Sequence, residues 1–169
     1  MTAATVDPDK EKCPKPACNH HCSVVEIGGF GVLIEGPSGS GKTSLALGLL
    51  ERCKARGVES ALVADDQALL ACSEGGLKAV APEAIRGMAE IRGYGIAALP
   101  FKNSAVVHLV VRLVDDEQVE RMPGQNDLDH IGDLVLCSPI PLYLLPRRHE
   151  AQSVRIVMAV LENRFGLRV

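Results

Sequence analysis

A glycine-rich segment in the first third of the chain has residue types suited to binding phosphate. Residues 36–43 read GPSGSGKT and match G-x-x-x-x-G-K-[ST] completely. Glycine lets the backbone curl so that successive N–H groups point at phosphate oxygens, while Lys42 supplies positive charge and the Thr43 hydroxyl can ligate Mg²⁺. The sequence therefore predicts a site for ATP with a divalent metal, formed by Gly36, Pro37, Ser38, Gly39, Ser40, Gly41, Lys42 and Thr43.

Two acidic residues end the next apolar segment. Asp65 and Asp66 directly follow the run 61–64 (ALVA). In many proteins with such a phosphate-binding loop, an acid in this place holds Mg²⁺. Because neighbouring residues of a strand point to opposite faces, we expect only one of the two to face the γ-phosphate. A solvated strand end is the alternative.

A second glycine-rich stretch contains an isolated acid–base pair. Glu90 and Arg92 lie within residues 87–96 (GMAEIRGYGI). The residue types fit a surface ion pair, and they fit equally a metal ligand beside a phosphate clamp. The pattern leaves both interpretations open.

Other basic residues carry weaker signals. His21 fits an ordinary loop residue before a strand, and Arg121 fits a solvated charge in a polar loop. Arg147 and Arg148, after Pro146, fit either a surface pair or a basic lip that binds anions. The residues alone do not assign these side chains a role.

Alternating strands and helices surround the phosphate-binding segment. Apolar spacing predicts helices over 42–56, which Gly57 ends, and over 151–164, with a helical turn at 82–88. Strands are predicted at 23–27, 31–35, 61–64, 105–113 and 140–145, with a hairpin over 67–80. This order predicts an α/β domain with a mixed sheet, in which the motif lies between a strand and a helix as its chemistry requires.

Length and composition favour one soluble cytoplasmic domain. The chain has 169 residues, of which 47% are hydrophobic, and its net charge of −3 argues against a general nucleic-acid binder. The sequence contains no apolar run near the roughly 20 residues of a membrane span. We expect a flexible N-terminal arm over 1–20 and a single catalytic domain over 21–169. The Cys and His residues at 13–22 match no standard zinc spacing, so reduced thiols are expected there.

Three motifs in order resemble the HPr kinase/phosphorylase family. They are GPSGSGKT at 36–43, LVADD at 62–66 and EIRGYGI at 90–96, of which the last is similar to the family's signature. The resemblance covers about 21–165 and only the family's C-terminal catalytic domain, as in short forms of the alphaproteobacterial type. It implies a phosphoenolpyruvate-carboxykinase-like fold and a hexamer.

The resemblance also implies roles for individual residues. With ATP and Mg²⁺, Asp65 would be the acid/base for a serine on an HPr-like phosphocarrier protein, in kinase and phosphorylase directions. His21 would lie beside Asp65, and Arg92 and Arg121 would steady phosphate while Lys42 acts with them. The metal would be held by Thr43, Asp66 and Glu90. The short form implies a carrier of the nitrogen-type phosphotransferase system.

One departure from the family pattern lies near the C-terminus. Residues 146–150 read PRRHE where the family has Pro-Arg-Pro-Gly-Arg-Asn, which leaves the phosphorylase direction and partner recognition open. Two alternatives to a protein-serine kinase are an ATP-sensing module without phosphate transfer and a small-molecule kinase. The presence of Lys42, Asp65 and Asp66 favours transfer, and no Arg-rich lid pattern accompanies them.

Overall fold

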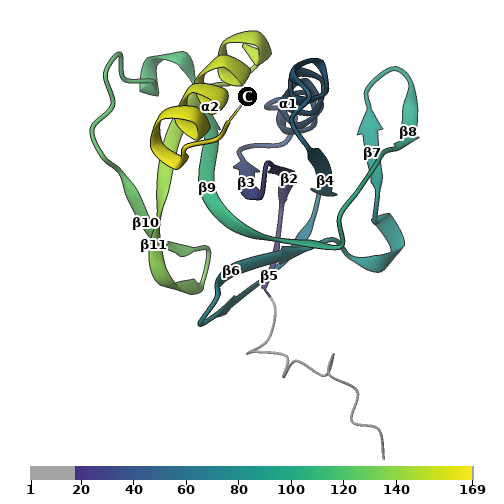
Figure 1. The fold of residues 1–169 in the computed structure, drawn as a ribbon, viewed down its shortest axis with the longest axis horizontal. Helices are drawn as coiled ribbons and strands as arrows, with labels where there is room; N and C mark the ends of the chain where they lie inside the picture. The colour runs from purple at the N-terminus through teal and green to yellow at the C-terminus, as the bar shows by residue number, and fades with distance from the viewer. Residues whose placement is uncertain (1–17, 169) are drawn as a thin grey trace, which may run out of the picture.

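The computed structural model describes residues 18–168 as a curled mixed sheet with two helices (Figure 1). The large sheet has nine strands, and its central path runs β1-β5-β6-β9-β3-β2-β4, with β11 also paired to β9 and β10 to β11. The elements are β1 (Cys18–His20), β2 (Cys22–Ile27), β3 (Phe30–Glu35), α1 (Lys42–Arg56), β4 (Ser60–Ala64), β5 (Ala68–Ser73), β6 (Gly76–Val80), η1 (Glu83–Ile85), β7 (Met88–Ile91), β8 (Gly95–Ala98), β9 (Ser104–Val114), η2 (Asp116–Gln118), β10 (Asp127–Ile131), β11 (Leu134–Pro146) and α2 (Glu150–Phe165).

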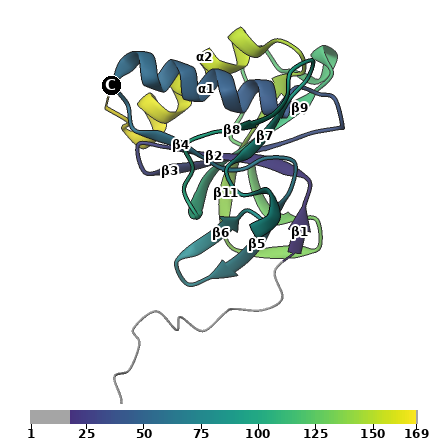
Figure 2. The same cartoon turned by 90° about the vertical axis from the view of Figure 1, so that its right-hand side faces the viewer.

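Both faces of the central strands are buried, which explains their nearly continuous apolar sequences. On β2, Val25 and Ile27 belong to the core cluster that includes residues of α1 and α2, whereas Cys22 and Val24 belong to the cluster formed with β5, β6, β10 and β11. Figure 2 shows the helices above the central strands and β1, β5 and β6 below them. The sheet thus lies between two separate apolar layers.

A glycine allows the strand that leads into the phosphate loop to meet its neighbour closely. β3 runs parallel to β9, with Gly31 opposite Val107. A Cβ atom at Gly31 would lie 2.2 Å from the carbonyl oxygen of Val106, so no larger residue fits without moving the backbone. This contact fixes β3, and with it the loop that follows.

Helix α1 begins and ends where the sequence predicts. Gly57 follows it in the left-handed conformation (φ 69°), and the N–H of Val58 donates to the Cys53 carbonyl at 2.9 Å, which closes the last turn. The helix packs against α2 near Gly48, where an added Cβ would lie 2.7 Å from Glu150 Oε1. Glycine at this position therefore brings the start of α2 close to α1.

The α/β class and the mixed sheet are confirmed: β3 and β11 run parallel to β9, and the other paired strands run antiparallel. The predicted strands at 23–27, 31–35, 61–64 and 105–113, the hairpin over 67–80 and both long helices are also present. The helical turn predicted at 82–88 is present as the short η1. The β7–β8 hairpin over 88–98 was not predicted, and β11 begins at 134, before the predicted start at 140.

The N-terminal prediction needs one correction. Residues 18–20, assigned to the flexible arm, form β1, because they pair antiparallel with residues 68–70 of β5. The rest of the predicted arm, with Cys13, lies outside the described residues. Within residues 18–168, none of the helices combines the length and the apolar character that crossing a membrane requires.

Candidate functional site

The phosphate loop joins β3 to α1 as a tight turn that depends on glycine. Gly36, Gly39 and Gly41 have φ values of 150°, 73° and 103°, which side chains disfavour. The N–H of Ser40 donates to the Pro37 carbonyl at 3.1 Å. Ser40 also has a buried hydroxyl for which the structure gives no hydrogen-bond partner. A buried orphan donor beside curled backbone fits a loop that receives an anion.

Lys42 folds back over this loop. Its Nζ donates to the carbonyls of Gly36 at 3.1 Å and Pro37 at 3.2 Å, and to His21 Nε2 at 2.9 Å. The residue is only 6% exposed. Burial lowers the Lys42 pKa, an effect opposed by the negative charges of Asp66 and Asp65. The ammonium group is therefore held against the start of the loop by three protein contacts.

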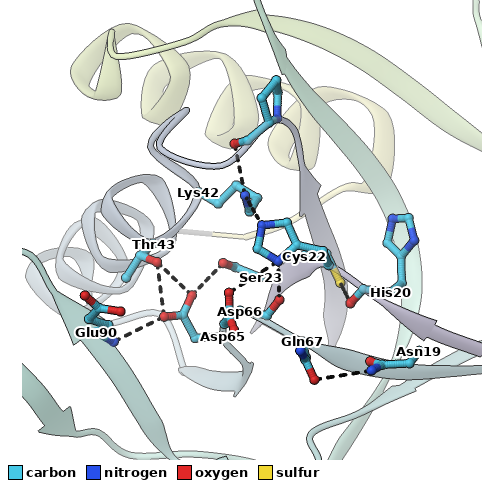
Figure 3. Close-up of polar contacts among 12 residues, drawn as sticks. Asn19, His20, Cys22, Ser23, Lys42, Thr43, Asp65, Asp66, Gln67 and Glu90 are labelled. Atoms are coloured by element: carbon cyan, nitrogen blue, oxygen red, sulfur yellow. Dashed lines mark hydrogen bonds and ion pairs between the residues drawn. The ribbon is translucent and has the colours of Figure 1, made fainter.

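Asp65 is buried and its carboxylate is fixed from three elements. Ser23 Oγ on β2 donates to Oδ1 at 2.6 Å, and Thr43 Oγ1 lies 2.9 and 3.1 Å from the two oxygens. The backbone N–H of Glu90 on β7 donates to Oδ2 at 3.3 Å. Figure 3 shows Asp65 at the centre of these contacts. The side chain is thus rigid and its oxygens are already engaged.

Asp66 differs from its neighbour in both backbone and exposure. Its side chain is 68% exposed, and its φ of 68° is unusual for a residue other than glycine. His21 Nδ1 lies 2.8 Å from the Asp66 carbonyl oxygen and 3.3 Å from Oδ1. The left-handed turn after β4 brings residue 66, instead of Asp65, against the β1–β2 junction. The family resemblance implied that His21 lies beside Asp65; its ring contacts Asp66, the next residue, and Lys42.

The contacts of His21 fit one tautomer. A proton on Nδ1 donates to the Asp66 carbonyl, which leaves Nε2 to accept from Lys42. His21 therefore joins the phosphate loop to the exposed acid. The imidazole orders both partners without needing a charge of its own.

A cavity of about 530 Å³ brings most of the predicted site residues together. Its lining contains the loop residues 38–43 with His21, Asp65, Asp66, Glu90 and Arg92. Arg121 is absent from this lining and lies exposed between η2 and β10. Arg148, His149 and Glu150 also line the cavity, although the sequence singled out only Arg148. Ser23 was missed altogether, because a serine in an apolar strand carries no sequence signal.

The donor set fits a magnesium ion. Thr43 and Asp65 place a hydroxyl and a carboxylate side by side at the loop, and the Glu90 carboxylate belongs to a residue lining the same cavity. Mg²⁺ typically takes one or two carboxylates together with substrate phosphates and water. Residues 18–168 contain no group of three or more His, Cys, Asp or Glu arranged to hold a metal. The protein oxygens fit an ion that is held jointly with a nucleotide.

A charged cluster lies beneath the loop. Glu35, the last residue of β3, accepts from His20 Nε2 at 3.0 Å and from Arg112 Nε at 2.5 Å. Burial by itself would raise the Glu35 pKa, but the hydrogen bond from His20 and the Arg112 charge outweigh it and hold the pKa below its ordinary value. An ionised Glu35 thereby ties β1 and β9 to the strand that leads into the loop.

Comparisons with known proteins agree with this geometry. Residues 15–165 match the family model described as HPr Serine kinase C-terminal domain. The chain is 32% identical over 163 residues to the HPr kinase/phosphorylase of Clostridium novyi (strain NT), covering 90% of this chain and 50% of that protein. It is 34% identical over 156 residues to that of Thermoanaerobacter sp. (strain X514), covering 86% of this chain and 48% of that protein. The chain thus spans about half the length of these curated relatives.

A solved structure supports the same fold. The Hpr(Ser) kinase/phosphatase from Coxiella burnetii matches with a TM-score of 0.68 at 26% sequence identity. The match covers 88% of this chain and 92% of that chain. The similarity therefore extends over most of the chain.

Proposed function

Because the chain belongs to the family of HPr serine kinase C-terminal domains, we propose that it transfers the γ-phosphate of ATP to a serine of an HPr-like phosphocarrier protein. One observation carries the proposal: a phosphate loop, a fixed acid and an exposed acid face one cavity, joined by Lys42 and His21. Phosphoryl transfer requires mainly positioning and charge neutralisation, and this arrangement supplies both.

Asp65 and Asp66 have different roles in the proposed reaction. Asp65, with its oxygens engaged by Ser23 and Thr43, serves the metal side of the site, where a bound Mg²⁺ would neutralise phosphate charge. The Asp66 side chain is 68% exposed and so accessible to an acceptor hydroxyl, and it takes the proton of the incoming serine. This exchanges the roles that the family resemblance implied, because both oxygens of Asp65 are already engaged by protein donors whereas the side chain of Asp66 is exposed.

The remaining side chains position these groups. His21 holds Asp66 through its carbonyl and carboxylate oxygens while accepting from Lys42, and so sets the acid next to the γ-phosphate end of the loop. Arg92, on the wall of the cavity, neutralises charge on the transferring phosphate. Glu90 supplies a second carboxylate on the metal side. Arg121 is assigned no role in this pocket.

Three further features follow from the family resemblance. The carrier belongs to the nitrogen-type phosphotransferase system, the enzyme works in the cytoplasm, and its assembly is a hexamer. In the reverse direction Asp66 would return its proton to the serine oxygen as inorganic phosphate attacks phosphoserine. These are proposals that rest on the family and on the motifs at 36–43 and 90–96.

A transfer assay tests the proposed activity. The full chain is incubated with γ-labelled ATP, Mg²⁺ and an HPr-like carrier, and label on a carrier serine is mapped by mass spectrometry. Transfer is expected with wild type and with Lys54→Ala, a matched change on the exposed face of α1, and is expected to fall at least about a hundredfold with Lys42→Ala. Nucleotide binding without label on any carrier serine would contradict the proposal.

A further inference from the structure

Some of the residues that line the cavity have no role in the proposed reaction. They are Ser44 and Leu47 of α1, together with Arg148, His149 and Glu150 at the start of α2. In Figure 3, Asp65 and Asp66 lie on one side of Lys42 and the ribbon of α2 lies on the other. Residues 146–150, here called the lip, contribute Pro146, Arg148, His149 and Glu150 to the lining of the cavity that also contains the loop and the two acids.

The direction of a bound nucleotide follows from the loop. The lysine of this motif reaches the β- and γ-phosphates, and the threonine serves the metal between them. Asp66 and Lys42 are joined through His21, which marks their side as the γ-phosphate end. The nucleoside of ATP is attached at the end of the triphosphate opposite the γ-phosphate, so we expect it to lie against cavity residues other than the acids, which include Ser44 and the lip.

The lip is held in place before any ligand binds. The N–H of Arg148 donates to the Ser40 carbonyl at 3.2 Å, which attaches the lip to the phosphate loop itself. Arg148 has a φ of 64°, an unusual conformation for a side-chain-bearing residue. His149 Nε2 lies 3.1 Å from Asp116 Oδ2, and Arg147 pairs with Asp115. These contacts orient the lip without using the ring faces of His149.

The chemistry of this region suits a nucleoside better than further phosphate. The His149 ring is half-exposed, and Leu47 lies half-buried in the same wall, so together they offer flat and apolar surface to a base. The Glu150 carboxylate would accept hydrogen bonds from a sugar or a base amino group, and would repel an inorganic polyphosphate. Arg148 adds positive charge where the α-phosphate would pass.

We infer that Leu47 and the lip form the nucleoside subsite of this pocket and make the chain select ATP over inorganic polyphosphate. This inference rests on the proposed function and adds the residues that choose the phosphate donor. Stacking of a base on an aromatic ring contributes about 1–3 kcal/mol as measured by alanine substitution. Loss of the His149 ring should therefore weaken ATP binding about tenfold.

Calorimetric titration with two ligands tests the subsite. MgATP and magnesium tripolyphosphate are titrated into wild type, His149→Ala and Leu47→Ala. Both variants are expected to weaken ATP binding by about tenfold and to change tripolyphosphate binding by less than about twofold. His130→Ala removes a comparable imidazole, paired with Asp129, that does not line the cavity; it should leave the ratio of the two affinities unchanged.

Two results would overturn the inference. His149→Ala could leave ATP binding unchanged, or it could weaken ATP and tripolyphosphate equally, and either result would show that the lip does not contact the nucleoside. If wild type bound neither ligand, the proposed function would fail and this subsite with it. A nucleoside-dependent loss confined to Leu47→Ala and His149→Ala supports the inference.

Discussion

The hydroxyl of Thr43 lies 2.9 and 3.1 Å from the two carboxylate oxygens of Asp65, which joins the first turn of α1 to the residue after β4. Thr43 is the last residue of the phosphate-loop motif, whereas Asp65 follows the separate strand β4. Their contact places two hard oxygen donors at the loop before nucleotide binds. The metal side of the pocket is therefore ordered by protein contacts alone.

Thr43→Val should remove the metal dependence of nucleotide binding, because valine keeps the shape of the side chain but has no oxygen ligand. In wild type, Mg²⁺ is expected to tighten ATP binding about tenfold or more; in Thr43→Val the affinities with Mg²⁺ and with EDTA should become nearly equal. Thr43→Ser retains the hydroxyl and is the matched control. Titration calorimetry checks both, and an unchanged Mg²⁺ effect in Thr43→Val would contradict the assigned role.

Ser23→Ala should destabilise the fold without removing a catalytic group. Ser23 is fully buried and its hydroxyl donates to Asp65 at 2.6 Å, so alanine leaves a buried carboxylate short of one donor. The free energy of unfolding is expected to fall by about 1–3 kcal/mol. Urea denaturation measures this change, with Ser73→Ala on the partly exposed end of β5 as the control. Equal stability of the two variants would mean that Asp65 does not depend on Ser23.

The Glu35 cluster predicts a specific pH dependence of stability. The folded-state pKa of Glu35 lies below its ordinary value of 4.5, so the folded protein favours the ionised form more than the unfolded chain does. The resulting stabilisation is complete at pH values above 4.5 and is lost as the pH falls through the folded-state pKa. Glu35→Gln should therefore lower the free energy of unfolding by about 1–3 kcal/mol near neutral pH and by progressively less in acid.

Urea denaturation of wild type and Glu35→Gln across the acid range checks this dependence. Glu162→Gln, which removes an exposed partner of Arg56, is the matched control and should change stability by less than about 1 kcal/mol at every pH. A difference between wild type and Glu35→Gln that stayed constant from neutral pH into acid would rule out an ionic role for Glu35.

Gly31→Ala should be among the most damaging small substitutions in the chain. The added methyl group would lie 2.2 Å from the Val106 carbonyl oxygen. The backbone of β9 cannot move away from it without disturbing the parallel β3–β9 pairing. A loss of about 3 kcal/mol or more is expected. Gly75→Ala, whose added atom would meet only the Ser73 hydroxyl at 3.7 Å, should be tolerated. Thermal unfolding distinguishes the two, and similar melting temperatures would contradict the packing argument.

Features encoded by short segments could be predicted from the sequence. The phosphate loop depends on glycines and a lysine within eight residues, and α1 depends on apolar spacing closed by Gly57, so both follow from local rules. The buried strands around them follow from apolar runs. The order of the motifs at 36–43, 62–66 and 90–96 allowed further residues of the cavity wall to be predicted, including Glu90 and Arg92.

Features set by long-range pairing could not be predicted in the same way. The contact of Ser23 with Asp65 joins residues 42 positions apart, and a serine in an apolar strand carries no sequence signal that predicts its partner. The partner of His21 depends on the left-handed backbone at Asp66, which a non-glycine residue seldom adopts. The β7–β8 hairpin was missed because its glycine-rich sequence lacks regular alternation. Arg121 was assigned from the family resemblance, and it is not among the residues that line the cavity.

The exchange of roles between the two aspartates is the central claim, and single-turnover phosphate transfer tests it most directly. With saturating MgATP and an HPr-like carrier, Asp66→Asn should bind ATP as wild type does but transfer phosphate at least about a hundredfold more slowly. Asp65→Asn should instead weaken the effect of Mg²⁺ on ATP binding, and part of its transfer should return at high Mg²⁺ concentration. Full transfer by Asp66→Asn, together with a Mg²⁺-independent loss in Asp65→Asn, would contradict the assignment and return the acid/base role to Asp65.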